Sequence, residues 1–132
     1  MDKPVKAKFD YDFQNDVLYM MQEKREYYSS IQNKDFIFDL DKNDNINGIE
    51  ILNVSRVIGT SKFFLNNIKS GTVQIETIKM DKGTLIKLHI YLECAVRNSN
   101  KIQSLNTENI SEDISVSEPE YLKPAYLNLA TA

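Results

Sequence analysis

Five oxygen-bearing side chains follow the spacing of a calcium-binding loop. They match positions 1, 3, 5, 9 and 12 of the EF-hand pattern, and they are Asp39, Asp41, Asn43, Asn47 and Glu50. Carboxylate and amide oxygens are the ligands that Ca²⁺ prefers. However, Asp44 stands where the loop needs glycine, and the flanking residues alternate with the period of strands instead of helices. A polar hairpin turn is therefore the preferred interpretation, and this calcium loop is the alternative.

His89 and Cys94 are the only residues of their types in the chain. Catalysis by a nucleophile and a base, or a transition-metal site, would need more partners than these two side chains supply. They are five positions apart on one predicted strand, so they project from opposite faces. We expect a solvated His89, a buried Cys94, no catalytic residues and no cofactor.

Aromatic and basic residues are interleaved near the N-terminus, as in proteins that stack single-stranded nucleic acid. The residues are Tyr11, Tyr19, Tyr27 and Tyr28 with Lys6, Lys8, Lys24 and Arg25. Four acids lie among them, namely Asp10, Asp12, Asp16 and Glu23. These acids disfavour a phosphate-binding surface, and strand propensity alone explains the tyrosines. Nucleic-acid binding and a carboxylate-based enzyme are therefore the weaker alternatives.

The elements that carry these residues are mostly strands. Alternating apolar and polar side chains predict a strand within residues 5–13 and a hairpin over Phe36–Ile58. Strand-favouring residues predict a second strand at 17–21, and a weaker third strand is expected at 27–32. Thr60 or Ser61 can cap a short amphipathic helix over 61–70, with Gly71 at its end. Residues 72–98 form a second hairpin, in which residues 86–96 alternate most regularly.

The composition changes after residue 98. Residues 1–98 hold 14 basic and 14 acidic side chains, whereas residues 99–132 hold 2 basic and 5 acidic ones. Low hydrophobicity and an acidic bias predict a flexible tail. The apolar residues near its end are expected to contact the body or a partner, and they are Tyr121, Leu122, Tyr126, Leu127 and Leu129.

The length of 132 residues suits one domain. A single cysteine predicts a reducing, cytoplasmic setting, and no apolar run is long enough for a membrane span or a signal sequence.

Two segments, FDYDFQNDVLYM and FDLDKNDNINGIEILNVS, resemble the short prokaryotic family DUF2283 over roughly residues 9–58. The residues that carry the resemblance are Tyr11, Asp12, Asp16, Leu18, Tyr19, Asp39, Asn45, Gly48, Ile49, Glu50, Ile51 and Leu52. The resemblance implies a small antiparallel sheet backed by a helix, no established activity, and an antitoxin-like or other protein-binding role. The second hairpin and the tail extend beyond the family pattern.

We therefore predict an α+β domain over residues 1–98, built as an antiparallel β-meander of about seven strands with one short helix, followed by the tail over 99–132. The expected function is a noncatalytic, regulatory or antitoxin-like binding module. Its partner is another protein or a second copy in a homodimer, and a self-associating structural β protein is the alternative.

Overall fold

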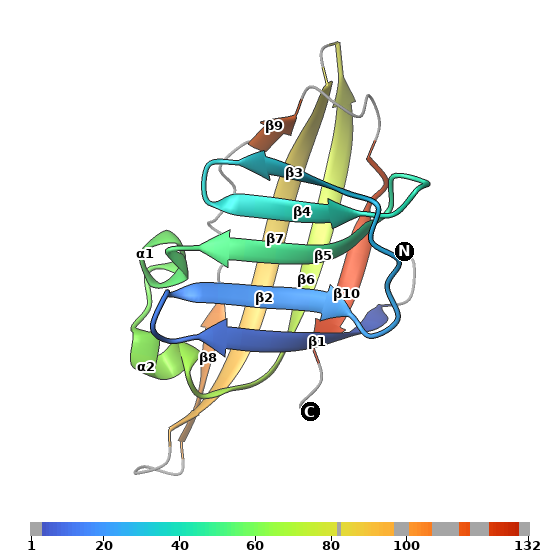
Figure 1. The fold of residues 1–132 in the computed structure, drawn as a ribbon. Helices are drawn as coiled ribbons and strands as arrows, with labels where there is room; N and C mark the ends of the chain where they lie inside the picture. The colour runs from blue at the N-terminus through green and yellow to red at the C-terminus, as the bar shows by residue number, and fades with distance from the viewer. Residues whose placement is uncertain (1–3, 82, 97–100, 107–113, 117–121, 130–132) are drawn as a thin grey trace.

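The computed structural model describes residues 4–81, 83–96, 101–106, 114–116 and 122–129. In these residues, ten strands form one sheet with the order β3-β4-β5-β2-β1-β10-β6-β7-β8, and β9 pairs with β7 away from this path. The sheet curls so that its two halves face each other as two layers whose strands cross steeply (Figure 1). The prediction of a mostly β domain is confirmed.

The first layer contains the five N-terminal strands. They are β1 (Val5–Asp12), β2 (Val17–Gln22), β3 (Ser29–Asn33), β4 (Phe36–Leu40) and β5 (Ile46–Leu52). Their residues alternate between the core and the outer face, as the period-two pattern predicts. However, β2 pairs with β5 instead of β3, so the predicted simple meander is wrong.

The second layer is built on a long hairpin. It contains β6 (Ile68–Met80), β7 (Gly83–Val96), β8 (Lys101–Asn106), β9 (Ile114–Val116) and β10 (Ala125–Leu129). The last strand, β10, pairs in parallel with β1 and antiparallel with β6, so it joins the two layers. The predicted all-antiparallel sheet with a separate tail needs correction, because β8, β9 and β10 all fall within residues 99–132 and belong to the sheet.

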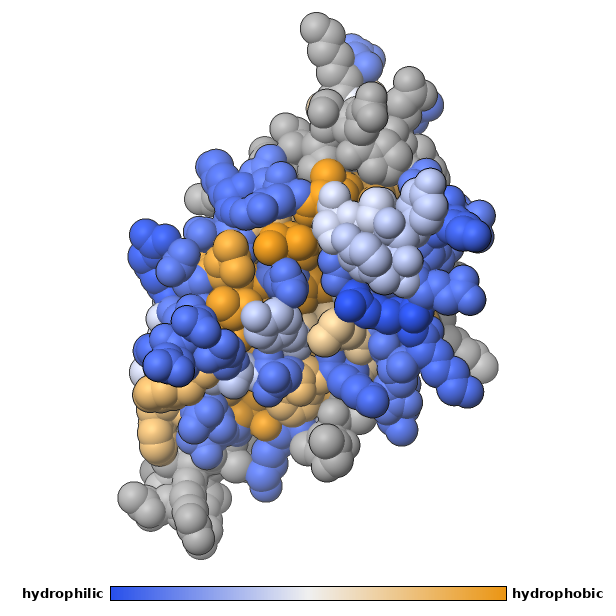
Figure 2. Space-filling model, in the orientation of Figure 1, coloured by the Kyte–Doolittle hydropathy of each residue, from blue (hydrophilic) through white to orange (hydrophobic). Residues whose placement is uncertain are grey.

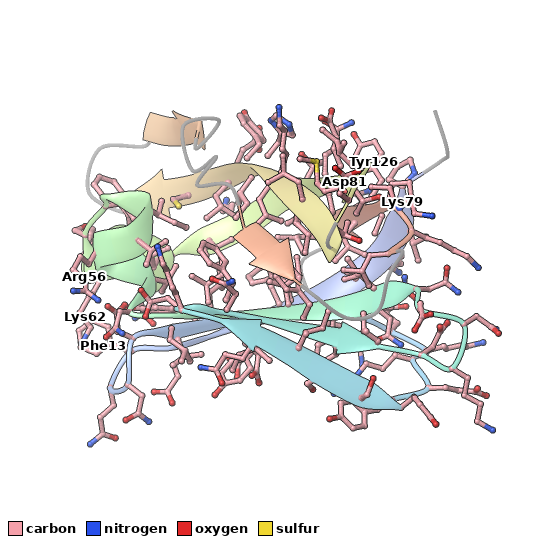
Figure 3. The ribbon with its side chains drawn as sticks, turned by 90° about the horizontal axis from the view of Figure 1, so that it is seen from above. Phe13, Arg56, Lys62, Lys79, Asp81 and Tyr126 are labelled. Carbon is pink, nitrogen blue, oxygen red and sulfur yellow. The ribbon has the colours of Figure 1, made fainter. Side chains whose placement is uncertain are left out.

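The hydrophobic core fills the space between the two layers (Figure 3). Phe38 and Ile49 come from the first layer, Ile75 and Leu88 come from the second, and each is at most 1% exposed. Each large apolar side chain buried in this way contributes about 1.5–3 kcal/mol to folding. The second layer, more than the helices, therefore covers the apolar face of the predicted opening hairpin.

Two short helices close one end of the molecule, where one was predicted. Helix α1 (Val54–Ile58) replaces the end of the predicted strand, and α2 (Lys62–Leu65) occupies the first part of the predicted 61–70 helix. Ser61 caps α2 by accepting a hydrogen bond from the Phe64 N–H at 3.2 Å, which confirms one of the two predicted caps. Gly71 lies inside β6, so its predicted role at the helix end is wrong.

Asp16 explains why the chain leaves β5 for α1. The Ser55 hydroxyl donates to Asp16 Oδ2 at 2.6 Å, and the Ser55 N–H points to the same carboxylate. Tyr11 donates to Asp16 Oδ1 at 2.8 Å. The carboxylate on the β1–β2 turn thus holds the start of α1 against the sheet.

Phe13, Arg56 and Lys62 mark this helical end, and Tyr126 lies at the opposite end (Figure 3). The Lys62 ammonium lies 4.6 Å from the centre of the Phe13 ring, a cation–π contact between α2 and the β1–β2 turn.

Among the residues that the structure describes, no helix is long and apolar enough to cross a membrane.

Candidate functional site

The outer face of the first layer carries a row of side chains that we call the Tyr19 strip, defined as Asp10, Tyr19, Glu50 and Ile37. In the sheet register, Tyr19 pairs with Asp10 on one side and with Glu50 on the other, and Glu50 also pairs with Ile37. Because side chains alternate along a strand, these four point away from the core. Asp10 is exposed, and the other three are half-buried. Figure 2 shows hydrophobic side chains in the middle of this face, bordered by hydrophilic ones.

Glu50 is a half-buried carboxylate that lacks a donor. Within the described part of the chain, no group donates a hydrogen bond to Glu50 or forms an ion pair with it. Burial raises the pKa of Glu50, the charge of Asp39 raises it further, and Arg25 partly offsets both effects. A carboxylate that has lost part of its hydration without gaining a donor is ready to accept one from a ligand.

Tyr19 is an aromatic ring in a negative electrostatic environment. Burial raises the pKa of its phenol, and Glu50, Asp12 and Asp10 add to this shift in that order. An aromatic face surrounded by carboxylates favours cations, because both the ring quadrupole and the acids attract positive charge.

A partly buried ion pair borders the strip. Arg25 donates a hydrogen bond to Asp39 Oδ2, and the Ser30 hydroxyl donates to Asp39 Oδ1 at 2.8 Å. The Arg25 guanidinium also lies 5.7 Å from the centre of the Tyr27 ring. The Arg25–Asp39 ion pair lies over Gly48, where an added Cβ would be 3.0 Å from both Arg25 Nη1 and Asp39 Oδ2. Glycine at position 48 therefore leaves space for the ion pair.

The residues of the predicted calcium loop are engaged in a β-hairpin. Asp41 Oδ1 accepts hydrogen bonds from the N–H groups of Asn43 and Asn45, at 2.8 and 3.0 Å. The Asn47 side chain donates to the Glu26 carbonyl at 3.0 Å. The flanks are strands β4 and β5, as the preferred turn interpretation requires, so the helices of an EF-hand are absent here. Among described residues, no three His, Cys, Asp or Glu side chains are grouped as metal ligands would be.

Three of the five predicted partner-binding residues near the end of the chain pack in the core. Leu122, Leu127 and Leu129 are at most 1% exposed and belong to the core, which is one of the two expected uses of this segment. Tyr126 is half-buried on β10, and Tyr121 lies outside the described residues.

His89 and Cys94 project from opposite faces of β7, as predicted. Cys94 is 2% exposed, and burial raises the pKa of its thiol. His89 is less solvated than expected, because its Nε2 is buried and lies 3.6 Å from Glu76 Oε2.

The aromatic and basic residues of the N-terminal segment do not form one platform. Tyr11 donates to Asp16, Arg25 pairs with Asp39, and Lys6 Nζ lies 3.7 Å from Glu23. Of the four tyrosines, Tyr19 alone belongs to the strip, whose charged members are acidic.

The sequence singled out Tyr19 and Glu50 separately and did not predict that they lie side by side in the sheet. Their contact depends on the pairing of β2 with β5, which are separated by two other strands in the chain. The only sequence signal was their shared outward position in alternating strands.

Comparison with known proteins adds three findings. Residues 8–55 match the model of the family described as "Protein of unknown function (DUF2283)". An uncharacterized protein of Methanocaldococcus jannaschii is 28% identical over 113 residues, which cover 82% of this chain and 95% of that protein. A protein of Methanosarcina mazei named "Putative hypoxanthine phosphoribosyltransferase" is 33% identical over 84 residues, which cover 64% of this chain and 68% of that protein.

No solved structure matches the chain. The family match runs from Lys8, within β1, through β5 to Ser55 and includes every residue of the Tyr19 strip, and the second layer extends beyond it. Residues 8–55 of the chain thus match the DUF2283 family, and the C-terminal extension completes the sheet.

Proposed function

We propose that the protein is a cytoplasmic, noncatalytic binding module that holds a basic segment of a partner protein on the Tyr19 strip. The observation that carries the proposal is the half-buried Glu50 carboxylate, which has no donor among the described residues and lies beside an aromatic ring. Arg25, the cation whose charge lowers the pKa of Glu50, already forms an ion pair with Asp39.

The strip suits a lysine or arginine side chain. Its aliphatic stem would pack on Tyr19 and Ile37, and its charged head would reach Glu50 and Asp10. A charge-assisted hydrogen bond to a partly desolvated carboxylate is stronger than one at a fully hydrated surface. The half-buried apolar neighbours would exclude water from this contact.

An antitoxin-like role is one form of this function, in which the partner is a toxin with a basic surface. The family resemblance suggests such a partner, and the acidic strip is compatible with it. A second copy of the chain is the other candidate partner, as in a homodimer.

The name of the Methanosarcina relative suggests a phosphoribosyl transfer reaction for that protein. Phosphate-bearing substrates are attracted by basic side chains or by backbone N–H groups. The charged members of the Tyr19 strip are acidic, so we do not extend the reaction to this site.

Affinity isolation from a lysate of the source organism tests the proposal. The double variant Tyr19→Thr/Glu50→Gln removes the aromatic ring and the charge while retaining strand-compatible residues. Asp81→Asn is the matched control, because Asp81 is an exposed carboxylate in the turn between β6 and β7, on the other layer. We expect wild type and control to retain the same protein, and the double variant to retain it at least about tenfold less well.

Equal recovery by the double variant would refute the proposal. Recovery of the chain's own copy, with a solution mass that doubles with concentration, would instead identify self-association.

A further inference from the structure

A cavity of about 500 Å³ lies between the layers at the end away from the helices. Tyr126, which lines it, is labelled at this end in Figure 3. Its walls come from both layers, from the Asp41–Asn45 turn and the ends of β1 and β2 on one side, and from β6 and β10 on the other. A volume of this size is in the range that accommodates small organic ligands.

Pro124 explains why the sheet opens at this point. β10 pairs with β6 from Leu129 back to Ala125, which lies opposite Ile75. Pro124 has no N–H to continue the ladder, and Lys123 turns away to form a bridge with Asn45 on the first layer. The space between this crossing segment and β6 is the cavity.

The lining combines an apolar part with acidic groups. Ile46 and Ile75 are each 1% exposed and lie beside Ala125. Among the described residues, the charged residues that line the cavity are two acids, Asp41 and Glu76, and the polar ones are Gln22, Asn45, Gln74 and Tyr126. Mouths of curled sheets with this mixture of groups are typical ligand sites.

Neighbouring cations leave the cavity itself acidic. Lys123 acts electrostatically on Asp41, Lys87 is the cross-strand partner of Glu76, and His89 lies beside Glu76 on the outer face, but none of these three residues lines the cavity. Burial alone would raise the pKa of Asp41, but hydrogen bonds from Asn45 and Asn43 lower it, so the carboxylate is ionised at neutral pH.

We propose that this cavity binds an organic cation, namely a primary amine that carries a short apolar chain. The apolar chain would lie on Ile46, Ile75 and Ala125, and the ammonium would be placed between the carboxylates and the Tyr126 phenol. The carboxylates exclude organic anions from the same space. The site is separate from the Tyr19 strip and does not depend on the function proposed for it.

Three probes of equal chain length test this inference: hexylamine, 1-hexanol and hexanoate. Each is titrated into the ¹⁵N-labelled full-length protein while amide resonances are followed. We expect hexylamine to shift the amides of Gln74–Glu76 and Ala125–Tyr126. Its Kd should be at least about threefold lower than that of hexanol, as expected for partly exposed charge pairs, and hexanoate should not bind.

Two variants assign the effect to the cavity. Glu76→Gln should weaken hexylamine binding about threefold and leave hexanol binding unchanged, whereas Glu26→Gln, at an exposed carboxylate outside both the cavity and the Tyr19 strip, should change neither. Val5→Trp should block all binding, because Val5 lies at the cavity and is 45% exposed, so the larger side chain can be accommodated at the rim.

Equal affinity for hexylamine and hexanol would overturn the inference, as would shifts confined to residues outside the cavity. The absence of any shift up to the solubility limit of hexylamine would also overturn it. Unperturbed resonances far from each substitution will show that the variants are folded.

Discussion

Glu50 on β5 is the direct cross-strand neighbour of Tyr19 on β2, on the face of the sheet that points away from the core. Burial raises the pKa of each side chain, and the charge of Glu50 raises the pKa of Tyr19 further. Tyr19 is a neutral phenol at pH 7, so the unfavourable group of the pair is the partly desolvated Glu50 carboxylate once it is ionised. Such an arrangement is more easily explained by binding than by stability.

Replacing Glu50 with glutamine should stabilise the free protein at neutral pH. The folded-state pKa of Glu50 is raised above its unfolded value, so the folded state holds this proton more tightly. The unfavourable contribution of Glu50 is absent below the unfolded pKa and develops as pH rises through the folded pKa. Thermal unfolding should therefore show a higher Tm for Glu50→Gln at pH 7 and no gain at pH 3.

Glu26→Gln is the control for this effect, because Glu26 is an exposed glutamate outside the strands. A lower Tm for Glu50→Gln at pH 7 would show that Glu50 serves stability instead.

Removing the Asp39 carboxylate should destabilise the protein substantially. Asp39→Ala leaves Arg25 without its partner, and the side chains of the pair are only 9% and 28% exposed. We expect a loss of about 1.5–3 kcal/mol, the range for hydrogen bonds to charged groups, in urea unfolding. Asp35→Ala should cost less than about 1 kcal/mol, because Asp35 lies 3.7 Å from an Arg56 side chain that is 76% exposed. Similar losses for the two variants would contradict this difference.

Asp16→Ala should release the start of α1. The substitution removes the acceptor for the Ser55 N–H and hydroxyl and for the Tyr11 hydroxyl, with an expected cost of about 1–2 kcal/mol. Burial alone would raise the pKa of Asp16, but bonds from Ser55 and Tyr11 lower it below its ordinary value. Its contribution is therefore present above the unfolded pKa and is lost as pH falls through the folded pKa.

Urea unfolding at pH 7 and pH 2.5 checks this dependence. The difference between wild type and Asp16→Ala should be smaller at the lower pH. A constant difference would show that ionised Asp16 does not act as the cap.

Gly71→Ala should be far more damaging than Gly59→Ala. An added Cβ at Gly71 would lie 2.3 Å from the backbone oxygen of Tyr91, and a backbone atom cannot move aside as a flexible side chain can. We expect a loss above about 3 kcal/mol, at the upper end for overpacking, or failure to fold. Gly59→Ala should cost about 1 kcal/mol, because Gly59 has a φ of 77° but open space around it. Circular dichroism and urea unfolding of both variants would test this order.

The sequence predicted the local elements of the first layer well. Alternation located β1, β2, β4 and the start of β5, and the inward residues of β7 from Ile86 to Cys94 are buried as predicted. Asp41 could be recognised as a turn residue because its hydrogen bonds are made within four positions along the chain. These features are local, so periodicity and turn chemistry were sufficient.

Long-range pairing could not be predicted in the same way. Leu127 and Leu129 lie in a segment of low average hydrophobicity, and their burial depends on β10 entering between β1 and β6. The start of α1 after β5 is held by Asp16, which is 39 positions away from Ser55. The Tyr19 strip likewise required knowledge that β2 lies beside β5.

The central claim is that the Tyr19 strip binds a basic segment, and a peptide titration tests it most directly. A lysine- and arginine-containing peptide is titrated into ¹⁵N-labelled wild type and Glu50→Gln, with a glutamate-containing peptide of equal length as control. We predict shifts at the amides of Tyr19, Ile37 and Glu50 with the basic peptide alone, and binding at least about tenfold weaker for Glu50→Gln. Shifts confined to other surfaces, or equal affinities of wild type and Glu50→Gln, would contradict the account.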